Sequence, residues 1–241
     1  MRITSIALFS LFGLSLLSCK RNVEEGHGTV KTETRNVSGF TAIEVSAPVD
    51  VTITVDSSKP TSVTLKGYAN LLEKITTTVE GGTLIIDKEH SIDLFNDDDM
   101  QATITVPSLS ALTIEGASDA DIKGMVTGAS FKLKVSGAGD VTIDKLNVSD
   151  FESTMSGAGD LHVKGGAVNT ASFSVAGAGD VSAYALRSKD ATVKVAGAGD
   201  VEVTVSDNLD AHVAGVGSVS YKGHPQLQSK VSGIGGVEDA N

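Results

Sequence analysis

The stretch Gly137-Ala138-Gly139-Asp140 decides the fold, because this tetrad returns three more times at intervals of 20 residues. The four copies are Gly137–Asp140, Gly157–Asp160, Gly177–Asp180 and Gly197–Asp200. A looser copy, Gly116-Ala117-Ser118-Asp119, precedes them, and Gly-x-Gly units at Gly215 and Gly233 follow with a spacing of 18 residues. A fixed period of this length predicts a stack of equivalent supersecondary units.

Short segments with alternating apolar residues flank each tetrad. The second tetrad follows Phe151-x-Ser153-x-Met155 and precedes Leu161-x-Val163. This alternation predicts strands that bury one face. Twenty residues with two or three such strands and glycine corners predict one coil of a parallel β-helix. The expected fold class is therefore all-β, a right-handed β-solenoid with coils of about 20 residues.

Glycines and aspartates of the tetrads have separate expected roles. The glycines are expected at structural turns because glycine accepts positive φ without steric cost. These turn residues are Gly137, Gly139, Gly157, Gly159, Gly177, Gly179, Gly197 and Gly199. The aspartates should form one column, in which each caps its own turn by accepting backbone N–H bonds or the column holds a cation such as Ca²⁺. This column comprises Asp140, Asp160, Asp180 and Asp200.

The N-terminus predicts a signal peptide over residues 1–18. A short positive start, Met1-Arg2, precedes an apolar run from Ile3 to Leu17 that is too short to span a membrane. The run ends in Leu16-Leu17-Ser18-Cys19, which resembles the lipobox of bacterial lipoproteins. The resemblance implies that Cys19 is acylated and anchors the chain to the membrane. The alternative is an ordinary cleaved signal with an incidental cysteine.

The remaining chain divides into a tether and one domain. Residues 19–35 are expected to be the acylated cysteine and a flexible tether, since the start of this stretch is polar without apolar periodicity. Residues 36–241 are expected to form a single solenoid domain, with irregular strands over 36–115 and Gly-x-Gly repeats over 116–237. An open last rung could pair end to end with a partner. We therefore expect the C-terminal tail to cover that rung, or the rung to self-associate.

Charge and composition exclude several function classes. The net charge is −11 and aromatic residues make up 4%, which argues against nucleic-acid binding. The five histidines share no metal-ligand spacing, and no serine lies in a strand–turn–helix elbow. The acidic stretch Asp97–Asp99, with Asp93 nearby, is expected to be a solvated loop. No catalytic residue is predicted.

The region after the tether resembles a known family. Asn36-Val37-Ser38-Gly39-Phe40-Thr41-Ala42-Ile43-Glu44-Val45, Gly82-Thr83-Leu84-Ile85-Ile86 and the repeated Gly-x-Gly units are similar to the auto-transporter adhesin head GIN domain of Bacteroidota envelope proteins. The resemblance covers about Val37 to Val237. It implies a right-handed β-helix, a secreted or lipidated envelope location and an adhesin role, and it implies no catalytic residues. No autotransporter barrel follows, so the acylated cysteine is expected to be the anchor.

Together these observations predict a non-catalytic lipoprotein of the outer membrane, periplasmic or surface-exposed, that acts as an adhesin or structural module. Its expected partners are the membrane, through the lipid, and a glycan or protein ligand. One alternative is a polysaccharide-acting enzyme, which would show a groove with three or more carboxylates and basic side chains. The other is a periplasm-facing scaffold without an external ligand.

Overall fold

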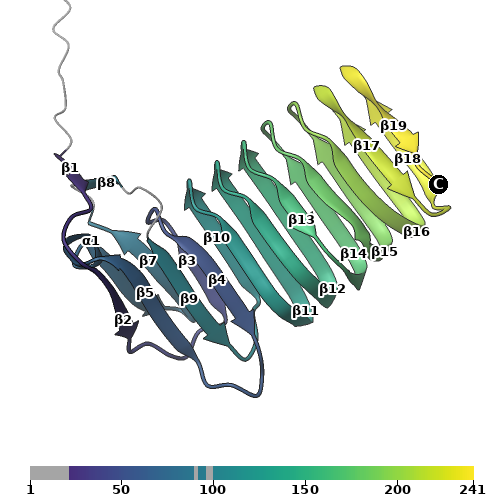
Figure 1. Cartoon of the computed structure of the whole chain (residues 1–241). Coiled ribbons are helices and arrows are strands. Elements are labelled where there is room, and N and C mark those ends of the chain that lie inside the picture. The colour runs from purple at the N-terminus through teal and green to yellow at the C-terminus, as the bar shows by residue number, and fades with distance from the viewer. Residues whose placement is uncertain (1–21, 90–91, 96–99) are drawn as a thin grey trace, which may run out of the picture.

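A computed structural model of the chain describes residues 22–89, 92–95 and 100–241. These residues form an all-β solenoid of about 6 turns, with coils of roughly 20 residues, so the predicted fold class is confirmed. Figure 1 shows the coils stacked side by side from the teal middle of the chain to the yellow C-terminus. One continuous sheet contains 17 of the described strands, and β1 and β8 form a separate pair.

The repeat region consists of long strands that pair in parallel. They are β10 (Ala111–Gly116), β11 (Ala120–Gly137), β12 (Val141–Gly157), β13 (Leu161–Val163), β14 (Gly166–Val175), β15 (Val181–Val195), β16 (Val201–Val213), β17 (Val216–Lys222), β18 (Gln226–Val231) and β19 (Ile234–Asp239). Phe131 pairs with Phe151, which pairs with Ala171, so the register repeats the 20-residue sequence period. Ala191 pairs with Leu209, which places the change to an 18-residue coil between β15 and β16.

The core runs along the axis of the stack. Phe131, Phe151 and Phe173 are each at most 2% exposed and lie on consecutive rungs. The rings of Phe131 and Phe151 are stacked with centroids 6.0 Å apart, whereas Phe151 and Phe173 meet edge to face at 5.6 Å. Aromatic pairs in these arrangements stabilise a core beyond the area that they bury. Each rung is therefore held by core packing to its two neighbours.

The N-terminal strands build the first rungs out of sequence order. The strands concerned are β3 (Ala42–Val45), β4 (Asp50–Val55), β7 (Thr83–Lys88) and β9 (Gln101–Val106). The β3–β4 rung lies between the β7–β9 rung and the β10–β11 rung, and all of these contacts are parallel. The β7–β9 rung comes later in the chain than the β3–β4 rung, yet it lies farther from the repeat region. The sequence did not predict this order, because it has no repeat before Gly116.

Antiparallel strands and a short helix close the N-terminal end. They are β2 (Val30–Arg35), β5 (Ser62–Tyr68), β6 (Ile75–Glu80) and α1 (Ala69–Leu72). β5 pairs antiparallel with both β2 and β9, and β6 forms a hairpin with β7. Leu71 and Leu72 of α1 are fully buried. This end of the solenoid therefore has a cap that differs from the repeating coils.

The prediction of a flexible tether over residues 19–35 is wrong for two segments. β1 (Asn22–Glu25) pairs in parallel with β8 (Ile92–Phe95), and β2 pairs with β5 over its whole length. The side chain of Asn70 also donates a hydrogen bond to the backbone oxygen of Glu25 at 2.9 Å. Polar composition hid these strands, because edge strands expose both faces and need no apolar alternation.

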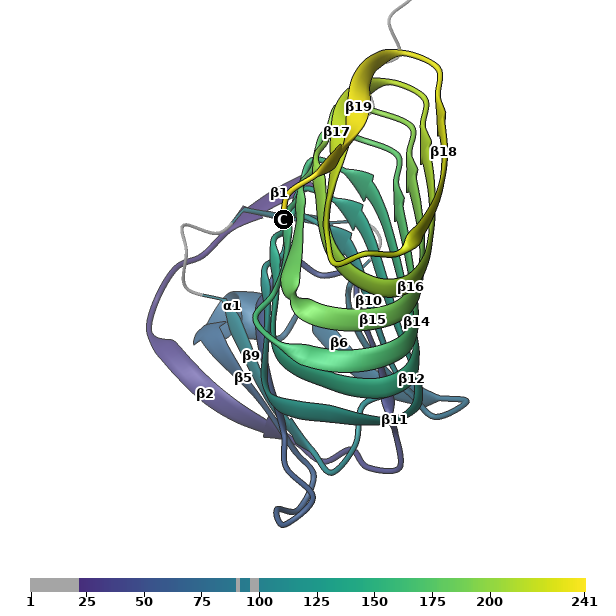
Figure 2. The same cartoon turned by 90° about the vertical axis from the view of Figure 1, so that its right-hand side faces the viewer.

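The C-terminal end is open. Leu227 and Val231 of β18 continue the inward columns of Leu209 and Val213, which are each 1% exposed, yet they are 42% and 43% exposed. The tail does not cross this end, since the side chain of Asn241 bonds to both backbone groups of Gly223 at 2.9 and 2.8 Å. Figure 2 looks toward this end and shows the C-terminus at its side. The expectation of a covering tail is wrong, and end-to-end self-association stays a prediction.

Candidate functional site

The tetrad glycines lie at the bends between successive strands, but positive φ is not the reason for them. Of the eight, only Gly137 has a positive φ, and its value of 157° is close to extended backbone. A Cβ placed on Gly177 would overlap the carbonyl oxygen of Gly157, and one on Gly197 would overlap that of Gly177. Glycine is required because any Cβ at these positions would point along the stack into the backbone of the preceding rung.

The tetrad aspartates form a hydrogen-bonded ladder that joins neighbouring rungs. Oδ1 of Asp140 accepts the backbone N–H of Asp160 at 2.9 Å, and Oδ1 of Asp160 accepts that of Asp180 at 2.8 Å. The ladder begins at Asp50, passes through Asp119 and ends where Asp200 accepts the backbone N–H of Ser218 at 2.8 Å. The expectation that each aspartate caps its own turn is therefore corrected: each caps the bend of the next rung.

Asp50 lies outside the repeat, so sequence spacing alone missed it as the first member of this aspartate ladder. One oxygen of each ladder carboxylate is committed to a backbone N–H. In residues 22–89, 92–95 and 100–241, no group of three or more His, Cys, Asp and Glu side chains is placed to hold a metal ion. Calcium binding by Asp140, Asp160, Asp180 and Asp200 stays a prediction.

An acidic hollow of about 360 Å³ opens beside the first rungs of the aspartate ladder. Asp50, Asp119, Asp121 and Asp140 line it, together with Gln101, Thr52 and Thr142. No lysine, arginine or histidine belongs to this lining. The hollow therefore brings four carboxylates together without the basic side chains that a polysaccharide-cleaving groove would need.

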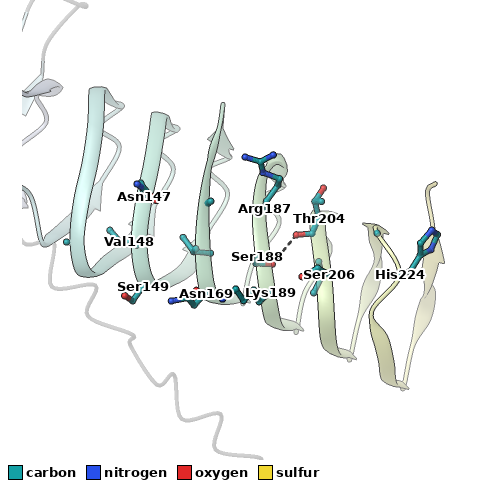
Figure 3. A pocket seen from close by; sticks show the side chains of 15 residues that line it. Asn147, Val148, Ser149, Asn169, Arg187, Ser188, Lys189, Thr204, Ser206 and His224 are labelled. Carbon is teal, nitrogen blue, oxygen red and sulfur yellow. Dashed lines mark hydrogen bonds between the residues drawn. The ribbon is translucent and has the colours of Figure 1, made fainter.

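A larger groove of about 730 Å³ runs along the stack over β12, β14, β15 and β16 (Figure 3). Its floor is one column of residues paired rung by rung: Gly128, Val148, Val168, Ser188 and Val205. Neighbouring parallel strands lie about 4.8 Å apart, so these five positions span about 20 Å. The groove is thus long enough to contact several units of an extended ligand.

Two rows of side chains, all polar except that of Ala167, flank the floor of the groove. Asn147, Ala167, Arg187 and Thr204 precede the floor residues in the chain and form the first rail. Ser149, Asn169, Lys189 and Ser206 follow the floor residues and form the second rail. In Figure 3, Arg187 and Lys189 lie on opposite sides of Ser188 on the same rung.

The electrostatic character of the groove contrasts with that of the whole chain. Its lining contains Arg187, Lys189 and His224 and no aspartate or glutamate, although the chain has a net charge of −11. None of these three side chains forms an ion pair within the described part of the chain. Sequence reasoning did not single out these residues, because the columns become adjacent only through the register of the rungs.

Several other sequence predictions can be located. Cys19 and the acidic stretch Asp97–Asp99 lie outside the described residues. His162 is exposed on β13, His224 is exposed in the connection between β17 and β18, and Nε2 of His212 lies 3.0 Å from Oδ1 of Asp210. Within the described ranges, no helix is both long and apolar enough to cross a membrane.

Comparison with solved structures places the fold among bacterial adhesin-like proteins. A putative adhesin from Bacteroides fragilis is 26% identical and has a TM-score of 0.79, with 90% of this chain and 99% of that chain covered. One from Parabacteroides distasonis is 24% identical, with a TM-score of 0.73 and coverage of 91% and 100%. A "putative lipid binding protein" from the same organism is 21% identical, with a TM-score of 0.73 and coverage of 91% and 100%.

No curated protein sequence matches this chain. The family described as "Putative auto-transporter adhesin, head GIN domain" matches residues 39–225, which are most of the described chain. The family description and two of these structures are named as adhesins, the third structure is named as a lipid binding protein, and none of these names is that of an enzyme. The chain belongs to the auto-transporter adhesin head GIN domain family, as the resemblance in its sequence predicted.

Proposed function

We propose that this protein is a non-catalytic adhesin of the bacterial cell envelope, attached to the membrane through a lipid on Cys19, and that it binds its ligand in the groove. The observation that carries the proposal is the groove itself, with two polar rails along a floor of five stacked rungs. Repeated rungs present similar contacts at regular intervals, which suits weak multivalent binding to an extended glycan or protein.

The distribution of charge favours binding over hydrolysis. Glycoside hydrolysis needs two carboxyl groups facing the scissile bond. The groove has basic residues and no carboxylate. The acidic hollow has four carboxylates and no basic residue, and three of them, Asp50, Asp119 and Asp140, already accept backbone N–H groups as members of the aspartate ladder. Neither site meets the criterion for a polysaccharide-acting enzyme that the sequence analysis set, namely three carboxylates together with basic side chains.

Lipid binding is a second candidate, because one structure of the same fold is named a putative lipid binding protein. A lipid chain would need an apolar surface to cover it. The valines of the groove floor, Val148, Val168 and Val205, are only 5%, 6% and 1% exposed. They offer an acyl chain little contact, which favours a hydrophilic ligand.

A screen with a matched pair of variants tests the proposed function. Soluble protein comprising residues 20–241 keeps every described residue and lacks the lipid. It is applied to arrays of glycans and envelope proteins as wild type, as Asn169→Trp, which fills the groove, and as Ala176→Trp, which adds the same ring at an exposed bend. Binding that Asn169→Trp abolishes and Ala176→Trp retains supports the proposal. Binding that is equal in all three proteins places the ligand elsewhere.

Location is tested separately on intact cells. Protease treatment should remove the solenoid from the cell surface, and a Cys19→Ala change should release the protein from the membrane fraction. A protein that intact cells protect from protease would instead support the periplasm-facing scaffold.

A further inference from the structure

We propose that the ligand of the groove is an acidic polysaccharide, and that Arg187 and Lys189 together hold one of its carboxylates above Ser188. The inference rests on the proposed binding function of the groove and adds the chemical class of the ligand.

Arg187 and Lys189 form a pair of cations across the floor of the groove. Both side chains are exposed, whereas Ser188 between them is 6% exposed. Figure 3 shows the two cationic side chains on opposite rails. Neither forms an ion pair with any carboxylate among the described residues. The arginine fork can make two parallel hydrogen bonds to a carboxylate, and the lysine adds a point charge from the other side.

The nearest acidic residues along the chain do not neutralise this pair. Asp190 faces a different hollow, where its Oδ1 accepts a hydrogen bond from the amide of Asn208 at 2.6 Å. Asp207 on the next rung accepts the hydroxyl of Ser206 at 2.6 Å and does not belong to the groove lining. The local field over Ser188 is therefore positive, and it favours an anionic group.

Neighbouring rungs offer partners for hydroxyl groups. Asn147 and Ser149 flank Val148, and Asn169 lies beside Val168 on the next rung. These three side chains are exposed and make no hydrogen bond within the described part of the chain. Amides donate and accept, and hydroxyls do both, so this stretch suits a polymer with many hydroxyl groups. A chain of sugar units places such groups at intervals close to the rung spacing.

Two features of the groove limit the kind of polyanion that fits. No phenylalanine, tyrosine or tryptophan lines the groove, so bases of a single-stranded nucleic acid would find little surface for stacking there. The net charge of −11 repels a densely charged chain outside the groove. Screening over about 8 Å at physiological salt leaves the local cations effective against a carboxylate in contact with them. The preferred ligand therefore carries carboxylates separated by neutral hydroxylated stretches.

Binding measurements on matched polysaccharides test the inference. The probes are hyaluronan, which has a carboxylate on every second sugar, and polygalacturonate and alginate, which have one on every sugar and serve as the densely charged comparison. Each is paired with its esterified counterpart, in which the carboxylates are neutral. The protein is the soluble chain 20–241 as wild type, as Arg187→Gln with Lys189→Gln, and as a control, Lys66→Gln with Lys194→Gln. The control removes the same charge at exposed positions outside the groove. Vesicles with and without anionic lipid form an additional arm.

We expect wild type to bind at least one acidic polysaccharide and to bind its ester more weakly. Loss of both groove cations should weaken binding by about tenfold for each cation, while the control pair stays near wild type. If wild type binds the acidic and esterified chains equally and Asn169→Trp abolishes that binding, the inference that the ligand is anionic is wrong, but the proposed function of the groove stands. The inference would also be overturned if wild type bound no acidic polysaccharide, or if it bound anionic vesicles and not the polysaccharides.

Discussion

Oδ1 of Asp160 accepts the backbone N–H of Asp180 across one rung at 2.8 Å. This bond repeats along one edge of the solenoid and satisfies a donor at each bend, where the regular ladder between strands is interrupted. We expect Asp160→Ala to lower the free energy of unfolding by about 1 kcal/mol, as the loss of a comparable helix-capping bond does. Urea denaturation followed by circular dichroism measures the change.

Asp160→Asn is the control for this bond. The amide keeps an oxygen that can accept the Asp180 N–H, and it removes one charge from a column of like charges. Its stability should equal or exceed that of wild type. Alanine and asparagine variants that are both as stable as wild type would show that the aspartate ladder does not stabilise the bends.

Gly177→Ala should destabilise the solenoid strongly. The new Cβ would overlap the carbonyl oxygen of Gly157, and backbone on both rungs would have to move apart. We expect a loss of more than about 3 kcal/mol, at the upper end of overpacking effects. Gly165→Ala is the matched control, because its Cβ would lie 3.8 Å from its nearest neighbour, the oxygen of Asp144. Equal melting temperatures for the two variants would refute the close-approach explanation.

The exposed last rung should make the protein self-associate. Ile234 and Leu227 are 78% and 42% exposed, and β18 and β19 each have one unpaired edge among the described strands. Light scattering on the soluble chain 20–241 should show dimers at micromolar concentration. Ile234→Lys with Leu227→Lys should give monomers, whereas Val23→Lys, at a 60% exposed valine near the other end, should not. A wild-type monomer at all concentrations would contradict this prediction.

The phenol of Tyr184 should lose its proton at a higher pH than that of a free tyrosine. Burial raises the pKa of its phenol above the usual value of about 10, nearby Glu202 and Glu238 add to the rise, and a hydrogen bond with Ser220 opposes it. The folded state thus favours the neutral ring, so its contribution to stability is present below pH 10 and is lost as pH rises past the folded pKa. Subtracting the tyrosinate absorbance titration of Tyr184→Phe from that of wild type should leave a midpoint above 10. A midpoint at or below 10 would contradict the burial effect.

The repeats allowed the solenoid to be predicted from sequence, because each 20-residue coil aligns identical positions in columns. Phe151, for example, was expected to face inward and is 2% exposed. The β3–β4 rung could not be placed, since no repeat relates it to the strands on either side. The tetrad glycines were expected to supply positive φ, which was wrong. The sequence alone does not show that a Cβ at these positions would meet the backbone of the neighbouring rung.

The groove was beyond sequence reasoning for a further reason. Arg187 pairs with Thr204 rather than with a residue 20 positions later, because the register shifts between β15 and β16. An unbroken 20-residue spacing would have paired Arg187 with the acidic Asp207, whereas the observed partner, Thr204, is neutral. The positive character of the groove therefore depends on this shift in the coil.

Adhesion of intact cells tests the central claim most directly. Cells that carry the full-length protein are applied to surfaces coated with the polysaccharide that wild type binds best, and are compared with cells carrying Asn169→Trp or Ala176→Trp at equal surface levels. The account predicts that wild-type and Ala176→Trp cells adhere and that Asn169→Trp cells do not. Equal adhesion of all three strains would show that the groove is not the binding site.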